Sequence, residues 1–130
     1  RDRSPSRGLG DVYKRQDKDA AVKYKEIYTP RFGDNFSVTV GGREWIDIMN
    51  KGINKGMAMR KIGELLGIDT SEMMAFGDNF NDAEMLKTVY YSYIVANAQP
   101  GMEKFARFRA PSNEERGVLQ VMEQVLAANL

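Results

Sequence analysis

Three oxygen-bearing side chains are gathered in the short segment GDNFND, which spans residues 77–82. Asp78 directly follows an apolar run that is typical of a buried strand, and Asn81 and Asp82 lie about one helical turn further on. We therefore expect these three side chains to converge at one edge of a sheet. Such a pocket suits Mg²⁺, which prefers one or two carboxylates together with waters and a phosphate oxygen. The alternative is an Asx-type turn followed by an ordinary helix cap.

Lys55 is the second candidate for chemistry, because it begins the helical pattern that precedes this strand. Where strands and helices alternate, the N-terminus of one helix and the end of the next strand lie at the same edge of the sheet. We therefore expect Lys55 to lie close to Asp78. A cation beside a metal-binding carboxylate indicates an anion such as phosphate between them. An ordinary surface lysine is the alternative interpretation.

The composition of the 130-residue chain restricts the chemistry further. It contains no histidine and no cysteine, which excludes Ser-His-Asp and Cys-His catalysis, Cys/His zinc sites and disulfides. Any catalysis must use carboxylates, Lys, Tyr, hydroxyls and a hard metal ion. With 42% apolar and 28% charged residues and only short apolar runs, the chain is typical of a globular domain or a piece of one. We expect no membrane partner and a cytoplasmic location.

The formal charge of +1 is unevenly distributed. Residues 1–16 carry a net charge of +3, and the remainder carries −2. This leader is rich in Arg, Ser and Gly, and it resembles the spurious translated ends of assembled metagenomic sequences. We expect residues 1–16 to be a non-native or disordered leader, with the native chain beginning near Asp17. The alternative is a basic arm for nucleic acid, but the acidic remainder argues against a nucleic-acid partner.

The chain after the leader begins with patterns typical of a helix and a hairpin. Residues 17–28 predict a short helix that ends before Pro30. Phe36–Val40 alternates apolar and hydroxyl side chains, and a second strand-like run follows two glycines, which predicts an antiparallel hairpin over Phe36–Met49. We expect Trp45 to be an aromatic anchor in the core or at an interface.

From Lys55 onward, helical and strand-like patterns alternate, which predicts an α/β fold with parallel strands. A helix from Lys55 closes at Gly67, and its apolar residues fall on one face. The other predicted elements are a strand over Met73–Phe76, a helix over Asp82–Val89, a strand over Tyr91–Ala96, a helix over Pro100–Phe108 and a last helix that Gly117 delays.

Four ordered motifs carry a family resemblance. The run KGINKGMAMRKIGELLGIDTSEMMAFGDNFNDAEML, then VANA, then SNEERGVLQVMEQVL closely resembles the haloacid dehalogenase-like (HAD) superfamily, specifically the Cof-type sugar phosphatases. The resemblance covers about Phe36 to the C-terminus. It implies that residues 51–130 are the C-terminal half of a Rossmann-like HAD core with parallel strands. It also implies that residues 17–50 are the tail of an αβ cap, consisting of a helix and a β-hairpin.

The same resemblance implies a role for each candidate residue. Lys55 would steady the charge of the nucleophile and the phosphate, and Asp78 would be the Mg²⁺ ligand. Asn81 would contact the phosphate, and Asp82 would support the water shell of the metal. The implied activity is Mg²⁺-dependent hydrolysis of a small phosphate monoester, such as a sugar phosphate, through an aspartyl-phosphate. The oligomeric state and the particular ester are not indicated.

The sequence also departs from the family pattern. Family members carry an apolar strand followed by DxDxT, whose first Asp is the nucleophile, and this sequence has no such motif. Asp17-Lys18-Asp19 has the DxD spacing, but no strand-like apolar run precedes it, and we interpret it as chance. We therefore expect this chain alone to be inactive. The alternative function is a non-catalytic module that binds metal or phosphate in the same pocket.

Overall fold

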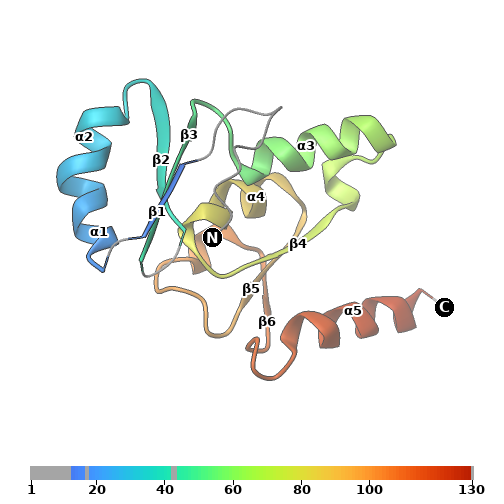
Figure 1. Cartoon of the computed structure of the whole chain (residues 1–130). Helices are drawn as coiled ribbons and strands as arrows, with labels where there is room; N and C mark the ends of the chain where they lie inside the picture. The colour runs from blue at the N-terminus through green and yellow to red at the C-terminus, as the bar shows by residue number, and fades with distance from the viewer. Residues whose placement is uncertain (1–12, 17, 42–43, 130) are drawn as a thin grey trace. The chain divides into compact units, whose positions relative to one another are not determined.

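The computed structural model describes residues 13–16, 18–41 and 44–129, and it contains two compact units (Figure 1). Residues 1–53 belong to the first unit and residues 54–130 to the second. Within the described residues, no helix is both long and apolar enough to cross a membrane.

The first unit contains a three-stranded antiparallel sheet. Its strands are β1 (Tyr13–Gln16), β2 (Phe36–Val40) and β3 (Trp45–Asn50), in the order β1-β3-β2. The predicted hairpin is confirmed, because β2 and β3 pair antiparallel with Val40 opposite Ile46. Ile46 is fully buried, whereas the Trp45 side chain is 43% exposed. Trp45 is therefore not a core residue, because alternation along the strand gives the buried position to its neighbour.

Strand β1 lies within the stretch that we expected to be a disordered leader. Residues 1–12 are outside the described residues, but Tyr13–Gln16 pair antiparallel with β3, with Tyr13 opposite Ile48. For these four residues the expectation of disorder was wrong. Low apolar content does not prevent pairing at a strand edge, because the bonds are made by backbone N–H and C=O groups.

The helix of the first unit runs further than predicted. It consists of α1 (Ala20–Lys23), a π-helical turn η1 (Tyr24–Tyr28) and α2 (Thr29–Phe32), and therefore passes through Pro30. Proline lacks an N–H and crowds the carbonyl four residues earlier, which normally ends a helix. Here the wide π-helical turn directly precedes it, and Pro30 lies in the first turn of α2, where no helical N–H is needed.

The second unit contains the predicted parallel sheet. Its strands are β4 (Met74–Gly77), β5 (Tyr91–Val95) and β6 (Phe108–Ala110), in the order β4-β5-β6. Both strand pairs are parallel, with Gly77 opposite Ile94 in the first pair. The predicted α/β fold with parallel strands is thus confirmed.

Three helices and three short 3-10 turns accompany this sheet. They are α3 (Lys55–Leu66), η2 (Thr70–Glu72), η3 (Phe80–Asp82), α4 (Ala83–Thr88), η4 (Glu103–Phe105) and α5 (Gly117–Ala128). As predicted, α3 ends at Gly67, which adopts the left-handed conformation with φ of 67°. The start of α5 at Gly117 also agrees with the delay expected from the sequence.

The predicted helix over Pro100–Phe108 was wrong. Gly101 adopts φ of 91°, which stops a helix after its first residues, and only the turn η4 follows. The backbone then extends into β6, where the Phe108 ring stacks on the Tyr93 ring of β5 with centroids 5.1 Å apart. Cross-strand packing of this kind outweighs the local signal of a proline in a first turn.

The core of the second unit lies on both faces of its sheet. Two adjoining clusters pack on one face, and their buried members are Met73, Ala75 and Val89 in the first and Leu86, Ile94 and Met102 in the second. A third cluster packs on the other face, and its buried members are Val95, Ala110 and Val121. Because α4 contributes Leu86 directly beside β4, this packing fixes the end of β4 and the start of α4 relative to each other.

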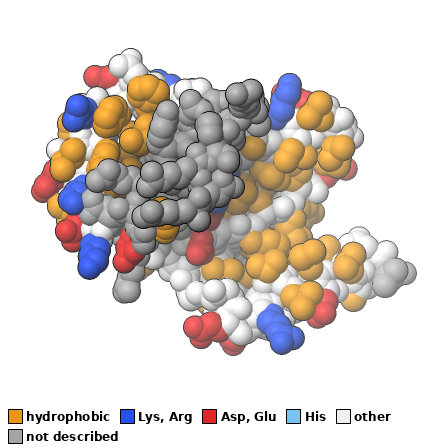
Figure 2. Space-filling view, viewed as in Figure 1, with side chains coloured by type: hydrophobic (Ala, Val, Ile, Leu, Met, Phe, Trp, Pro, Cys, Tyr) orange, Lys and Arg blue, Asp and Glu red, His pale blue; other side chains and the backbone are white. Residues whose placement is uncertain are grey.

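Part of the apolar surface of the second unit is uncovered. Within the described residues, β4 is an edge strand that pairs only with β5. The apolar faces of α3 and α5 are exposed on either side, as Figure 2 shows. The exposed side chains are Met57, Ile62, Leu65 and Leu66 on α3, and Leu119, Met122, Val125 and Leu126 on α5. An apolar strand without a partner, flanked by apolar helix faces, is typical of a sheet that continues.

Candidate active site

Asp78 lies at the carboxyl end of β4, as the sequence predicted. It is the first residue after the strand and is exposed, whereas the preceding Gly77 is buried. Its backbone carbonyl accepts a hydrogen bond from the Gln99 N–H at 2.8 Å. The loop after β5 therefore fixes the backbone of Asp78. The Asp78 carboxylate lies at the edge of the sheet where ligands of α/β folds bind.

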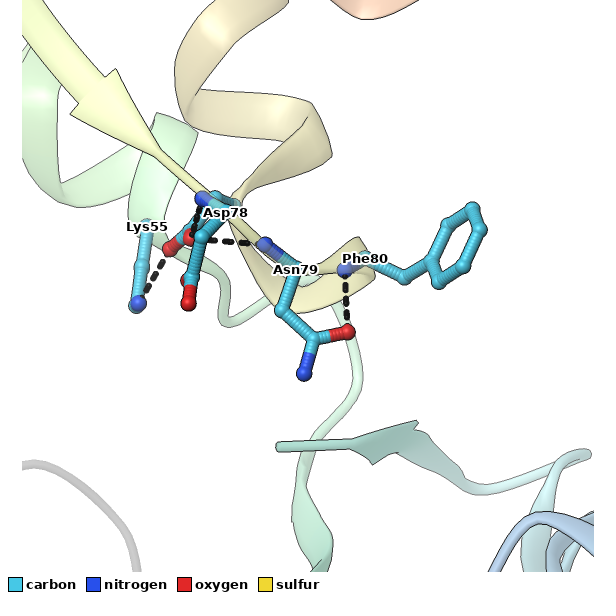
Figure 3. A network of polar contacts seen from close by, with 5 residues as sticks. Lys55, Asp78, Asn79 and Phe80 are labelled. Atoms are coloured by element: carbon cyan, nitrogen blue, oxygen red, sulfur yellow. Dashed lines mark hydrogen bonds and ion pairs between the residues drawn. The ribbon is translucent and has the colours of Figure 1, made fainter. Parts of the chain in front are cut away.

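Lys55 forms an ion pair with Asp82 (Figure 3). The lysine is the first residue of α3, and the Asn54 side chain caps this helix by accepting the Met57 N–H at 2.9 Å. The Lys55 side chain is half exposed, whereas Asp82 is only 4% exposed. The cap and the ion pair together fix the ammonium group, and it lies close enough to the Asp78 carboxylate for its charge to act on that group, as Figure 3 also indicates.

The second oxygen of Asp82 organises the turn after β4. Oδ2 accepts the N–H of Asp78 at 3.1 Å and the N–H of Asn79 at 3.3 Å. Asn79 is the N-cap of η3 and forms a capping box with Asp82, and its Oδ1 also accepts the Phe80 N–H at 2.8 Å. Both oxygens of Asp82 therefore have partners, and the buried carboxylate joins the start of α3 to the end of β4.

Glycine at position 77 is needed for space. The φ angle of Gly77 is outside the left-handed region, so its backbone conformation does not require glycine. A Cβ atom there would lie 2.7 Å from the Asp82 Cβ and 3.1 Å from Leu86 Cδ1. Gly56 is similarly crowded, because a Cβ would lie 2.5 Å from the Glu84 carbonyl oxygen of α4. Both glycines let Asp82 and the start of α3 come close.

The electrostatics of the site favour a bound cation. Partial burial raises the pKa of the Asp78 carboxyl above its ordinary value, and the charge and hydrogen bonding of Asp82 raise it further. Lys55 offsets part of this effect. Two carboxylates that share one ammonium group leave room for additional positive charge.

The oxygen donors fit Mg²⁺, although the described chain supplies few of them. Among residues 18–41 and 44–129, no three acidic side chains form a metal cluster. Asp82 is engaged with Lys55 and two amides, so Asp78 supplies the exposed carboxylate. Mg²⁺ is commonly held by one or two carboxylates with waters and a phosphate oxygen, so this donor set suits it better than a metal that needs an all-protein cage.

Of the predicted residues, Lys55, Asp78 and Asp82 come together, whereas Asn81 is half-buried in η3 and takes no part in the network around Asp82. Asn79 was not predicted from the sequence, although its spacing from Asp82 is that of a capping box. A contact between the loops after β5 and β6 was not predicted either. In it, the Asn97 Nδ2 donates to the Asn113 Oδ1 at 2.6 Å, and the Asn113 N–H donates to the Asn97 Oδ1 at 3.1 Å.

Comparison with known proteins agrees with this geometry. The sequence profile of the haloacid dehalogenase-like hydrolases matches residues 2–122. The chain therefore belongs to this family, as the motif resemblance indicated.

Three similar proteins illustrate the relationship. A 5-amino-6-(5-phospho-D-ribitylamino)uracil phosphatase of Escherichia coli is 40% identical over 85 residues, which are 65% of this chain and 31% of that protein. A crystal structure from Streptococcus mutans has a TM-score of 0.79 and 34% identity, and the match covers 96% of this chain and 47% of that one. A HAD subclass IIB sugar phosphatase shares the fold, with a TM-score of 0.77 and 21% identity over 88% of this chain and 42% of its own. The chain spans less than half the length of each of these three proteins.

Proposed function

We propose that this chain is part of a Mg²⁺-dependent HAD phosphatase that hydrolyses small phosphate monoesters. The observation that carries the proposal is the pairing of Lys55 with the buried Asp82, which holds an ammonium group beside the exposed carboxylate of Asp78. A cation fixed next to a carboxylate that suits a metal forms a site for the oxygens of a phosphoryl group.

Each residue then has a distinct task. Mg²⁺ held by Asp78 would offset charge on the phosphoryl oxygens during transfer. The Lys55 ammonium binds a second phosphoryl oxygen, and Asp82 keeps this ammonium in place while holding the backbone of residues 78 and 79. Asn81 lies in the same turn, and its amide is available to contact the phosphate. None of these residues is the nucleophile.

The nucleophile of the proposed reaction belongs beside the free edge of β4. A strand that paired in parallel with β4 would end next to Asp78, so a carboxylate at its end would face the phosphoryl group that Lys55 binds. The exposed apolar faces of α3 and α5 flank this edge and would cover the added segment. The greater length of the relatives supports a longer polypeptide. Attack by this carboxylate would give an aspartyl-phosphate, which water then hydrolyses.

The proposed substrate class is the sugar phosphates and related small monoesters. It is supported by the Cof-type motifs around Lys55 and Asp78, and by the phosphorylated sugar-alcohol chain in the name of the E. coli relative. We propose that residues 17–50, with their helix and hairpin, are the tail of an αβ cap domain. The second candidate function is a non-catalytic metal- or phosphate-binding module. It is favoured by the single exposed carboxylate, Asp78, in the described part of the site.

The test is a phosphatase assay on the longer polypeptide, in which an upstream segment with a DxDxT strand precedes this chain. We expect Mg²⁺-dependent hydrolysis of sugar phosphates that Asp78→Ala abolishes and Lys55→Ala reduces severely. Lys61→Ala is the matched control, because Lys61 lies on α3 and pairs with Glu64 at 3.2 Å. Phosphate binding without hydrolysis in the longer protein would favour the non-catalytic module instead.

A further inference from the structure

A hollow lined by basic side chains lies at the opposite edge of the parallel sheet from Asp78. It has a volume of about 230 Å³, and its charged lining is Lys87, Lys104 and Arg107. Lys87 lies near the end of α4, and Arg107 directly precedes β6, so both lie at the amino edge of the strands. Among the residues that the structure describes, no carboxylate lines this hollow. It is smaller than most pockets for organic ligands, which favours a small anion.

The cations of the hollow are held by aromatic rings more than by acids. The ammonium groups of Lys87 and Lys104 lie 5.1 Å and 4.9 Å from the centroid of the same ring, that of Phe105. The Arg107 guanidinium lies 4.7 Å from the Tyr90 ring centroid.

The nearby carboxylates neutralise only part of this charge. Glu84 pairs with Lys87 at 2.7 Å, and Glu103 approaches Arg109 at 3.8 Å. Within the described chain, Lys104 and Arg107 have no ion pair. Like charges gathered around one opening repel each other, and a bound anion relieves that repulsion.

A buried hydroxyl group also lines the hollow. Ser92 is fully buried, and its Oγ accepts the Arg107 N–H at 3.1 Å, which fixes the backbone that carries the arginine. Among the described residues, the Ser92 hydroxyl donates to no acceptor, and because the residue is fully buried it forms part of the wall of the hollow. The groups that would donate to phosphate oxygens are the ammonium and guanidinium groups of the lining.

We propose that this hollow binds a phosphate group, either as inorganic phosphate or on a small ester, at a site separate from the one that contains Asp78. The charge of the three cations and the small volume together favour a compact dianion. In the sheet order, β6 is on the far side from the free edge of β4, so a segment that pairs with β4 leaves the hollow open. The proposal stands whether or not the chain forms part of a phosphatase.

The test is a titration of the full chain with inorganic phosphate, followed by NMR of the backbone amides, with sodium chloride at matched ionic strength as the reference. We expect saturable shifts at Ser92 and at residues 104–107 that differ from any shifts at residues 77–82. A second titration with glycerol phosphate distinguishes the sources: tighter binding than inorganic phosphate indicates an ester ligand, and weaker binding indicates the free ion.

Matched lysine variants test the residue assignment. Lys104→Gln should weaken phosphate binding at the hollow at least fivefold, whereas Lys61→Gln, which removes an exposed lysine on α3, should leave it unchanged. Asp78→Asn should also leave it unchanged, which separates this site from the proposed active site. The proposal is overturned by the absence of saturable shifts at residues 92 and 104–107 in the unaltered chain. Equal binding by the Lys104→Gln variant would overturn it as well.

Discussion

The carboxylate of Asp82 is buried and joins the Lys55 ammonium to the backbone N–H groups of Asp78 and Asn79. One side chain therefore connects the first residue of α3 to the turn after β4. Three donors depend on a single acceptor, so the geometry of the candidate site should fail as a unit when this acceptor is removed.

The first prediction concerns this acceptor. Asp82→Ala should lower the free energy of unfolding by about 2 kcal/mol, because it leaves donors without a partner in a buried place. Urea denaturation of the full chain measures the change. Glu64→Ala is the control: it removes an exposed carboxylate paired with Lys61 and should cost less than about 0.5 kcal/mol. Equal stability of the two variants would contradict the role given to Asp82.

The second prediction concerns Gly77. Gly77→Ala should destabilise the chain by about 1–3 kcal/mol, because the new Cβ would lie 2.7 Å from the Asp82 Cβ and force the turn to move. The variant should also lose Mg²⁺ binding. Gly67→Ala is the matched control, because its cost comes from a left-handed backbone with φ of 67° in α3's C-cap, away from the site. It should destabilise the chain but keep Mg²⁺ binding.

The third prediction is the pH dependence of stability. The pKa of Asp78 is raised in the folded chain, so between the unfolded and folded pKa values the folded state binds more protons. The stability contribution of this group is therefore present at low pH and lost as the pH rises through the raised pKa. Relative to the unaltered chain, Asp78→Asn should become more stable as the pH rises above about 4.

Asp69 provides a control of opposite sign. Hydrogen bonds from Ser71 lower the pKa of the Asp69 carboxyl below its ordinary value. The unaltered chain should therefore gain stability over Asp69→Asn as the pH rises through the lowered pKa towards 4. Urea denaturation at on the order of ten pH values between about 2.5 and 7 measures the free energy of unfolding of each variant relative to the unaltered chain. The same sign for both variants would show that the environment of Asp78 is wrongly described.

The elements that place the site follow patterns that a sequence shows directly. The apolar run before Asp78 predicted β4, and the alternation of helices and strands predicted that Lys55 would lie at the same edge. These inferences succeed because periodicity and chain direction determine which edge a residue reaches. The family motifs led to the same positions.

The contacts that hold the site were not predictable in the same way. Local spacing does not reveal that Asp82 is buried beneath Lys55, or that Gly77 is needed to make room for it, because these facts depend on how α3 and α4 pack. The apolar face of α3 was visible in the sequence, but what covers it was not. The helix end predicted before Pro30 was wrong because a π-helical turn, which has no sequence signature here, accommodates the proline.

The fourth prediction concerns the exposed apolar faces beside β4. Leu66 is 66% exposed, so Leu66→Glu should change the stability of this chain by less than about 0.5 kcal/mol. In a longer polypeptide that covers this face, the same change should cost more than about 2 kcal/mol, because it buries an unpaired charge. Urea denaturation of both proteins makes the comparison, with Lys61→Gln as a control that should be neutral in each. An equal effect of Leu66→Glu in the two proteins would argue against a segment packing on α3.

The central claim is that Asp78 holds the Mg²⁺ of a phosphoryl-transfer site, and a Mg²⁺ titration of this chain by isothermal calorimetry and amide NMR tests it most directly. We expect binding in the millimolar range, about 4 kcal/mol, because the chain supplies few ligands. The changes in amide chemical shift on adding Mg²⁺ should centre on residues 77–82, disappear in Asp78→Asn and persist in Asp69→Asn. Mg²⁺ binding that is unchanged by Asp78→Asn, or shifts that centre elsewhere, would contradict the account.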